Sequence, residues 1–225
     1  MTLGKVTILE HTPKDPFNIM GEMAGECWGS DTSDDAKNER RGKQCVADGH
    51  GRIWELADVY MKLEGYSARV MREWYTHIGG APTRLQASTR YINYDNLAVI
   101  EPPKIKCDAV ASKVYNECIE NIRNTYKTLI DLGMTKEDVA NILPLGMETV
   151  VMDKRNARNL VEMSHQRLCS RAYWEYRMLM HDIMKALSEY SPQWKFIVDN
   201  YMKPKCDVYG YCTEHNSCGR MEKKI

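Results

Sequence analysis

The chain has 225 residues, and its 31 lysines and arginines balance 31 aspartates and glutamates, so the formal net charge is zero. A hydrophobic content of 43% predicts a water-soluble domain with a substantial core. These values argue against a membrane protein and against bulk electrostatic binding of nucleic acid polymers. Because Lys5, Glu10 and His11 interrupt the first residues, we expect no secretory signal and a cytoplasmic location.

The first part of the chain mixes irregular and regular patterns. Residues 1–20 predict an extended lead-in, and the polar, glycine-rich residues 21–49 predict a mixture of helix and mobile loop. From Asp58 apolar and polar residues alternate, which predicts a strand that Gly65 ends. Ser67 then predicts the N-cap of a helix.

The middle of the chain combines short strands with one long helix. Two glycines and a proline exclude a continuous helix over residues 76–90. Apolar residues three to five positions apart between Val110 and Ile130 predict a helix with one apolar face. The predicted elements are a strand over 97–100, the long helix over 108–132, a short helix after Thr135 that stops before Pro144, and a strand over 148–152.

The last part of the chain is predicted to be helical. We expect one long helix from Asn156 into the 180s and a final helix that begins at Ser191–Pro192 and ends near Met202. Strands and helices do not alternate strictly, so the order predicts an α+β fold with a mixed or antiparallel sheet packed against long helices. We expect a single domain over residues 1–203 and a cysteine-containing tail over 204–225.

Residues 77–91 are the most chemically loaded part of the sequence. Gly79 and Gly80 would let a ligand approach the backbone closely. Arg84 and Arg90 carry planar donor groups suited to phosphate or carboxylate. This composition predicts an anion site. The alternative is a solvated turn whose arginines pair with acidic neighbours.

A second polar cluster lies at the start of the predicted C-terminal helix. Arg158, Glu162 and His165 are spaced to share one helix face, whereas Arg167 falls on the opposite side. A helix that presents polar groups on two sides is not a simple surface helix, so the cluster is a second candidate site. The alternative is an ion-paired surface helix.

The C-terminal tail contains a third cluster, of possible soft ligands. Cys206, Cys212 and Cys218 are separated by five residues each, and His215 lies between the last two. This spacing is looser than that of most zinc sites. A metal site, a redox-active thiol pair and reduced structural cysteines all remain open for these residues.

The order of the motifs resembles that of the flavin-dependent thymidylate synthase family. The resemblance covers residues 50 to 192, well over half of the chain. The motifs that carry it are His50-x4-Glu55, Arg72-Glu-Trp-Tyr-Thr-His77, Ser88-Thr-Arg-Tyr91, Leu143-Pro144, Asn156-Ala-Arg158, Arg167 and Ala172-Tyr-Trp-Glu175-Tyr-Arg177.

This resemblance implies a homotetramer of α+β protomers that holds FAD in pockets built from several subunits. It implies that the protein methylates dUMP to dTMP, with methylenetetrahydrofolate as the carbon donor. NADPH would supply the hydride through FAD. No nucleic acid polymer and no membrane would take part.

The resemblance also implies roles for individual residues. Ser88, Arg90 and Arg167 would take part in catalysis at the nucleotide, and His50 would lie where the folate stacks near the flavin. The nucleotide would contact Arg72, Glu73, Arg84, Gln86, Ser88, Thr89, Arg90 and Arg167. The flavin would contact Glu55, His77, Gly79, Gly80, Asn156, Arg158 and Glu162.

The sequence departs from the family pattern at several of these positions. The usual Arg-His-Arg motif is Thr76-His77-Ile78 here, and Arg84 would replace one lost cation. Gln86 stands where the family has glutamate, and Glu162 where it has asparagine. These departures leave open a related flavin enzyme that modifies another pyrimidine nucleotide, for example by hydroxymethylation. The cysteines between Cys206 and Cys218 leave open a non-catalytic, metal-binding interaction protein.

Overall fold

Four antiparallel strands and the helices around them form an α+β domain, which confirms the predicted fold class. The computed structural model describes residues 3–224. The strands lie in the order β1-β2-β4-β3, with bounds β1 Lys5–Ile8, β2 Asp58–Ser67, β3 Thr83–Gln86 and β4 Glu148–Asn156. Within the described residues, one compact unit comprises residues 3–63, 76–84 and 152–224, and the other comprises 64–75 and 85–151.

The alternating pattern of β2 places its apolar side chains in the core. Val59, Met61 and Leu63 are fully buried, as the period of two predicts. We expected the strand to end at Gly65, but it continues to Ser67. Gly65 adopts a φ of 73°, which glycine tolerates because it has no Cβ atom, so the backbone can pass through this residue without ending the strand. Residues 97–100 form only an isolated bridge, between Val99 and Met147, rather than the predicted strand.

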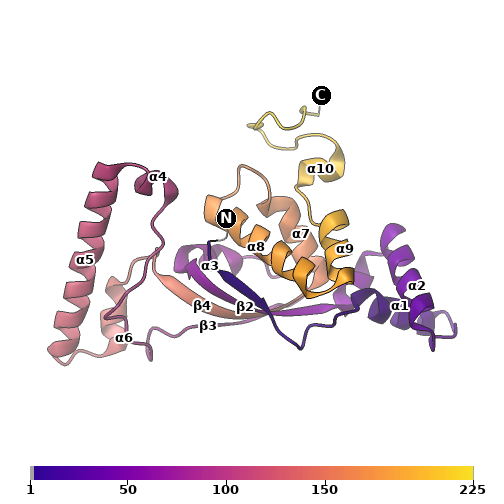
Figure 1. Cartoon of the computed structure of the whole chain (residues 1–225), viewed down its shortest axis with the longest axis horizontal. Helices are drawn as coiled ribbons and strands as arrows, with labels where there is room; N and C mark the ends of the chain where they lie inside the picture. The colour runs from indigo at the N-terminus through magenta and orange to yellow at the C-terminus, as the bar shows by residue number, and fades with distance from the viewer. Residues whose placement is uncertain (1–2, 225) are drawn as a thin grey trace. The chain divides into compact units, whose positions relative to one another are not determined.

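In the first unit, two helices pack closely where an extended segment over residues 1–20 and a mixture of helix and mobile loop over residues 21–49 were expected. α1 spans Pro16–Cys27 and α2 spans Asp35–Ala47 (Figure 1). A Cβ atom on Gly21 would lie 1.8 Å from the carbonyl oxygen of Asn38, so glycine allows the two backbones to approach. The polar composition of this stretch hid the hairpin, because its contact depends on small residues rather than on an apolar stripe.

The predicted C-terminal helix is two helices. α7 spans Ala157–Arg167 and α8 spans Trp174–Tyr190. A turn separates them, and the Arg177 guanidinium donates a hydrogen bond to the carbonyl oxygen of Ser170 within it. No proline or glycine marks this break in the sequence, and the structure shows that α8 after the break packs against β1.

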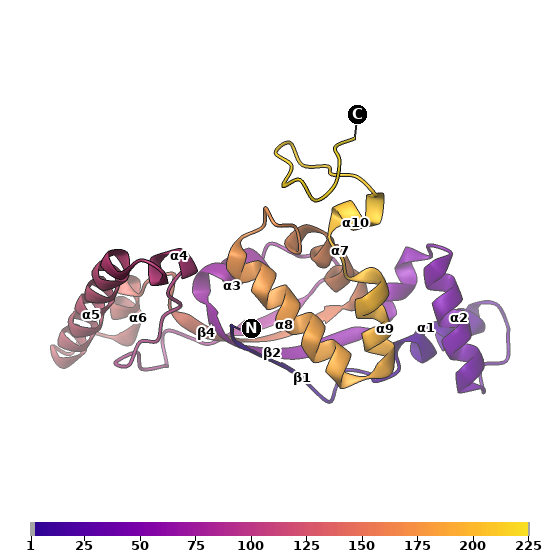
Figure 2. The same cartoon turned by 45° about the horizontal axis from the view of Figure 1, so that its top comes forward.

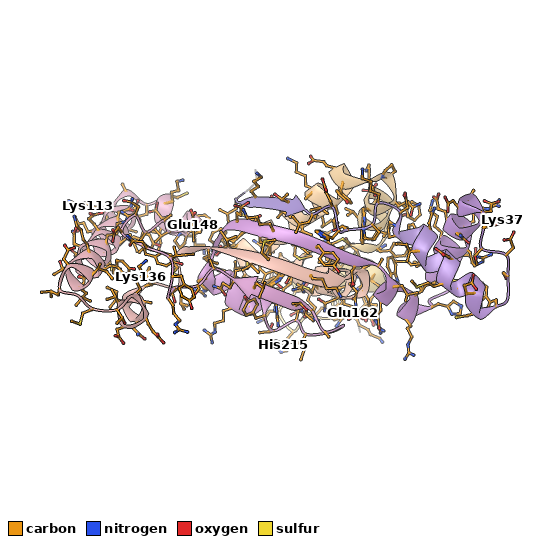
Figure 3. All side chains as sticks on the ribbon, turned by 90° about the horizontal axis from the view of Figure 1, so that it is seen from below. Lys37, Lys113, Lys136, Glu148, Glu162 and His215 are labelled. Carbon is orange, nitrogen blue, oxygen red and sulfur yellow. The ribbon has the colours of Figure 1, made fainter. Side chains whose placement is uncertain are left out.

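α8 and the helix that follows it cover one face of strands β1 and β2 (Figures 2 and 3). α9 spans Pro192–Tyr201, and the Ser191 side chain caps it by accepting a hydrogen bond from the Trp194 amide, as predicted. The short helices of this unit are the 3₁₀ helix Gly51–Leu56 and α10, Lys205–Tyr209.

The second unit contains the predicted long helix. Its helices are α3 (Ala68–Trp74), α4 (Pro103–Lys106), α5 (Ala109–Asp131), α6 (Lys136–Val139) and the 3₁₀ helix Ala140–Ile142. The predicted caps are confirmed, because Ser67 accepts from the Val70 amide and Thr135 from the Asp138 amide. Among the residues described, no helix combines the length and apolar character needed to cross a bilayer.

The apolar face predicted for α5 is buried over only part of its length. Tyr126 is fully buried in a cluster with Tyr94, Leu97 and other residues, as expected for the core-facing side. In contrast, Val110 is 75% exposed, so the first turns of α5 do not join this core.

Candidate functional site

A cavity of about 240 Å³ lies beside the first turns of α7. Six of the residues predicted to contact flavin line it: Glu55, Gly79, Gly80, Asn156, Arg158 and Glu162. They come from three places in the chain, namely the 3₁₀ helix, the glycine turn before β3, and the β4–α7 junction. The structure thus brings together residues that the sequence places as much as 107 positions apart, from 55 to 162.

The β4–α7 junction forms one wall through an N-cap. The Asn156 side chain accepts a hydrogen bond from the Asn159 amide at 2.9 Å and so begins the helix. Asn159 also lines the cavity, although the motifs did not point to it. Asn159 lies three residues after Asn156, which the sequence could have identified as an N-cap, and this spacing could have predicted that Asn159 lies at the cavity.

Below this wall, a buried ion pair fixes the junction. Arg155 is fully buried and donates two hydrogen bonds to the Asp153 carboxylate, at 2.6 and 2.8 Å. A third bond, from Arg155 Nη1 to Asn159 Oδ1, measures 2.6 Å. Arg155 therefore ties the end of β4 to the first turn of α7 and holds Asn159 at the cavity.

Gly79 and Gly80 form another wall of the cavity. Because these two residues have no side chains, their backbone can lie close to α7. Gly80 adopts a φ of 72°, and a Cβ atom there would lie 2.1 Å from Asn156 Nδ2. A Cβ atom on Gly79 would lie 3.1 Å from Asn159 Nδ2. Gly80 is therefore required for the turn to approach α7 in this conformation, whereas at Gly79 a shift of a few tenths of an ångström by the Asn159 side chain would make room for a Cβ atom.

Arg158 lies between two carboxylates of the cavity. Its Nη1 contacts Glu55 Oε1 at 2.6 Å, and its Nε contacts Glu162 Oε1 at 2.9 Å. The hydrogen bonds to Glu162 and Glu55 raise the pKa of the guanidinium. All three side chains are partly exposed, so a ligand can reach them and displace one carboxylate (Glu162 is labelled in Figure 3).

His77 lies against Arg167 rather than in the lining of this cavity. Arg167 Nε donates a hydrogen bond to His77 Nε2 at 2.9 Å, and its guanidinium carbon lies 4.5 Å from the centre of the Tyr176 ring. Burial, followed by the charges of Arg167 and Arg155, lowers the pKa of His77 to about 4. His77 is therefore a neutral acceptor at pH 7. Tyr176 belongs to the motif of residues 172–177, which assigned it no role, and the structure places its ring against the Arg167 guanidinium.

The Ser88-Thr-Arg motif forms a turn after β3 in the second unit. The Ser88 hydroxyl accepts a hydrogen bond from the Arg90 amide at 3.3 Å, and Gln86 Nε2 lies 3.4 Å from Thr149 Oγ1. The Arg90 side chain is exposed and pairs with Glu137 at 3.1 Å. An exposed arginine on a turn can bind a phosphate by exchanging this surface carboxylate for it.

The other predicted nucleotide and folate residues are placed as follows. Arg72 and Glu73 lie in the last turn of α3, in the same unit as Ser88. Arg84 lies on β3 and Arg167 at the end of α7, both in the first unit. His50 is exposed at the start of the 3₁₀ helix and does not line the cavity beside α7.

The cysteine tail does not form a metal site in the described residues. Within residues 3–224, no three histidine, cysteine, aspartate or glutamate side chains are grouped so that they could hold a metal ion. The interpretation of the chain as a metal-binding protein therefore gains no support from the structure.

Comparison with known proteins identifies the family. The family model described as thymidylate synthase complementing protein, Thy1, matches residues 7–193, most of the chain. The chain belongs to the Thy1 family. The resemblance of the motifs to flavin-dependent thymidylate synthases is thereby confirmed at the level of the family.

Relatives from bacteria and archaea agree with this assignment. The chain is 27% identical to a flavin-dependent thymidylate synthase of Clostridium tetani over 97% of the chain and 95% of the relative. It is 25% identical to one of Geobacter sulfurreducens over 84% of each protein, and 26% identical to one of Pyrococcus furiosus over 94% of the chain and 90% of the relative. Thy1 is a family of enzymes, and these similarities extend over nearly the whole chain.

Proposed function

We propose that this Thy1 protein is a flavin-dependent thymidylate synthase that converts dUMP to dTMP. It would use methylenetetrahydrofolate as the carbon donor and NADPH as the hydride source. The observation that carries the proposal is the cavity beside α7, because it gathers six predicted flavin residues from three separate segments. Family membership supports the same reaction.

The donors and the backbone of this cavity fit FAD. Arg158 supplies a guanidinium, and Asn156 and Asn159 contribute polar amides near the N-terminus of α7, a position that favours phosphate. The backbone of Gly80 packs directly against the Asn156 side chain and so fixes this wall of the cavity. These residues would hold FAD, and the chemistry that the bound group would supply is hydride transfer between NADPH and the one-carbon unit.

The residues of this chain would bind and orient the nucleotide. Arg90 would hold the phosphate of dUMP, with Ser88 and Thr89 offering hydroxyl and backbone groups in the same turn. Arg167 would stabilise negative charge on a carbonyl oxygen of the uracil ring, which makes ring carbon C5 nucleophilic. His77, neutral at pH 7, holds Arg167 Nε and so orients the guanidinium plane.

The cavity beside α7 would enclose only part of a flavin dinucleotide. The cavity of about 240 Å³ is smaller than the roughly 300–1,000 Å³ of pockets that hold small organic ligands. This shortfall supports the proposal that the protein is a homotetramer in which neighbouring subunits complete each pocket. Light scattering coupled to size-exclusion chromatography measures the assembly, and a monomer that binds FAD tightly would contradict this part of the proposal.

The visible spectrum of the purified protein tests the cofactor. After incubation with FAD and removal of unbound FAD, we expect flavin absorbance that dUMP perturbs, since the nucleotide would bind beside the flavin. Protein that remains colourless after FAD is added would overturn the proposal.

Product analysis tests the reaction. With dUMP, methylenetetrahydrofolate, NADPH and FAD, we expect dTMP. The replacement of a glutamate by Gln86 in the proposed nucleotide region makes hydroxymethylated dUMP the alternative product, and mass spectrometry separates the two.

A further inference from the structure

A second cavity, of about 490 Å³, lies between α7 and the C-terminal tail. Four cysteines line it: Cys169, Cys206, Cys212 and Cys218. Cys169 follows the end of α7, and the other three belong to the tail that begins with α10 (Figure 1). The thymidylate synthase reaction proposed above uses none of these thiols.

An ion pair holds two parts of the tail together beside this cavity. Arg220 Nη2 contacts Asp207 Oδ2 at 2.5 Å. Cys206 is adjacent to Asp207, and Cys218 is two residues before Arg220. The ion pair therefore holds the chain segment that carries Cys206 next to the chain segment that carries Cys218.

The tail around these cysteines is held by few backbone contacts. α10 ends at Tyr209, and in the described residues after it the regular backbone pairing is an isolated bridge between Cys212 and Lys223. A disulfide needs Cα atoms within about 7 Å of each other. Cys206 lies in the short helix α10, whereas the segment that carries Cys218 has no helix or strand, so it can move toward Cys206 with little loss of structure.

Cys206 and Cys218 differ in their surroundings in a way that suits two different roles. Cys218 is exposed, and hydrogen bonds from the Ser170 hydroxyl and the Arg220 amide lower the pKa of its thiol. Cys206 is half-buried, and burial followed by the Asp207 carboxylate raises the pKa of its thiol. An exposed thiol with thiolate character reacts first, and a less acidic neighbour completes the exchange.

We propose that Cys206 and Cys218 form a redox-active dithiol that reacts with low-molecular-weight disulfides. Cys218 is the attacking thiol and Cys206 is the resolving thiol. A ligated metal does not explain the cluster, because the described residues contain no group of three ligands able to hold one. A standing structural disulfide does not explain it either, since each of the four cysteines is a free thiol.

The exchange balances in two steps. The Cys218 thiolate attacks one sulfur of the small disulfide, which forms a mixed disulfide and releases one small thiolate. The Cys206 sulfur, after losing its proton, attacks the Cys218 sulfur of the mixed disulfide and expels the second small thiolate. The protein dithiol is oxidised to a disulfide, the small disulfide is reduced to two thiols, and these take up the two protons.

Oxidised glutathione is the probe for the test, applied to the full-length protein in its native state. After incubation, free thiols are alkylated and the protein is digested with trypsin and with a protease that cleaves after glutamate. Cleavage after Lys205, Glu214 and Arg220 separates Cys206 and Cys212 from Cys218. We expect the two fragments to remain joined by a disulfide, with Cys212 alkylated.

Three variants identify the pair. Cys206→Ser should stop at a glutathione adduct on Cys218, and Cys218→Ser should leave Cys206 alkylated. The matched control is Cys107→Ser, because Cys107 is exposed between α4 and α5 and does not line the cavity. This variant should form the same cross-link as the wild type.

Other outcomes overturn the proposal. Fragments that separate in the wild type, or a cross-link that survives Cys206→Ser, would contradict the assigned pair. Because a substitution can disturb folding, tandem mass spectrometry of the wild-type cross-linked peptides reads the bonded cysteines directly. A bond that involves Cys212 or Cys169 instead would also count against the proposal.

Discussion

Arg167 donates a hydrogen bond from Nε to Nε2 of His77 at 2.9 Å and lies over the ring of Tyr176. A histidine that accepts from an arginine must be neutral at the accepting nitrogen. The arrangement thus links the protonation state of His77 to the position of a residue proposed to act on the uracil ring.

We expect the stability of the protein to fall as the pH drops through this titration. Burial and the charges of Arg167 and Arg155 lower the pKa of folded His77 to about 4, from 6.5. Between these values the unfolded chain binds a proton that the folded chain does not, so the free energy of unfolding decreases toward pH 4. Urea unfolding at a series of pH values measures the slope.

The variant His77→Asn should show a shallower slope, because it removes this group from the titration. The variant His181→Asn, at an exposed position of α8, is the matched control for the loss of one histidine side chain. His165, whose pKa is also lowered by burial, adds a slope of the same sign to all three proteins. Equal slopes in the wild type and His77→Asn would contradict the assigned pKa.

The variant Arg90→Ala should weaken dUMP binding while it spares FAD. Loss of a charge-assisted hydrogen bond to phosphate removes about 1.5–3 kcal/mol, which is roughly a 10- to 100-fold loss of affinity. Isothermal titration with dUMP measures the change. Glu137→Gln removes only the carboxylate that pairs with Arg90, so it should not weaken binding. Unchanged dUMP affinity in Arg90→Ala would disprove the phosphate role.

The variant Gly80→Ala should weaken FAD binding by at least tenfold. Its new Cβ atom would meet Asn156 at 2.1 Å, so the glycine turn or the cap of α7 has to move. Gly29→Ala is the matched control, because Gly29 also has a positive φ but a Cβ atom there would have no neighbour within 4 Å. Both variants bear the backbone strain of about 1 kcal/mol. Fluorescence titration should therefore show weaker FAD binding by Gly80→Ala than by Gly29→Ala. Equal FAD affinities would contradict the close contact between Gly80 and Asn156.

The variant Arg155→Met should be among the most destabilising single changes in the first unit. It would leave the Asp153 carboxylate fully buried without its bidentate partner, a loss of about 3–5 kcal/mol. Lys154→Met removes a neighbouring, partly exposed pair with Asp58 and should change stability by less than about 1 kcal/mol. Chemical denaturation of the two variants compares them, and similar losses would argue against a buried ion pair.

The variant Gly21→Ala should separate α1 from α2. A methyl group there would meet the backbone of Asn38 rather than a movable side chain, and overpacking of this kind destabilises by about 1–3 kcal/mol. Glu22→Ala, exposed on the same helix, should be nearly neutral. Thermal unfolding measures both, and a Gly21→Ala protein as stable as Glu22→Ala would show that the hairpin packs differently.

Much of the local structure follows from a few neighbouring residues. The alternation of β2, the caps at Ser67, Thr135 and Ser191, and the extent of α5 depend on hydrogen bonds and periodicity within one or two turns. The order of short motifs in the same sequence was sufficient to indicate the family that the comparison later identified.

Tertiary structure decided what the sequence could not. No proline or glycine in the sequence indicates the break between α7 and α8. The contact of α1 with α2 and the pairing of Glu55 with Arg158 bring together segments whose local sequences do not indicate each other. The sequence determined which residues are chemically capable of binding a flavin and a nucleotide. Only packing decided which of them meet, because a cavity wall exists when distant segments bury their surfaces against each other.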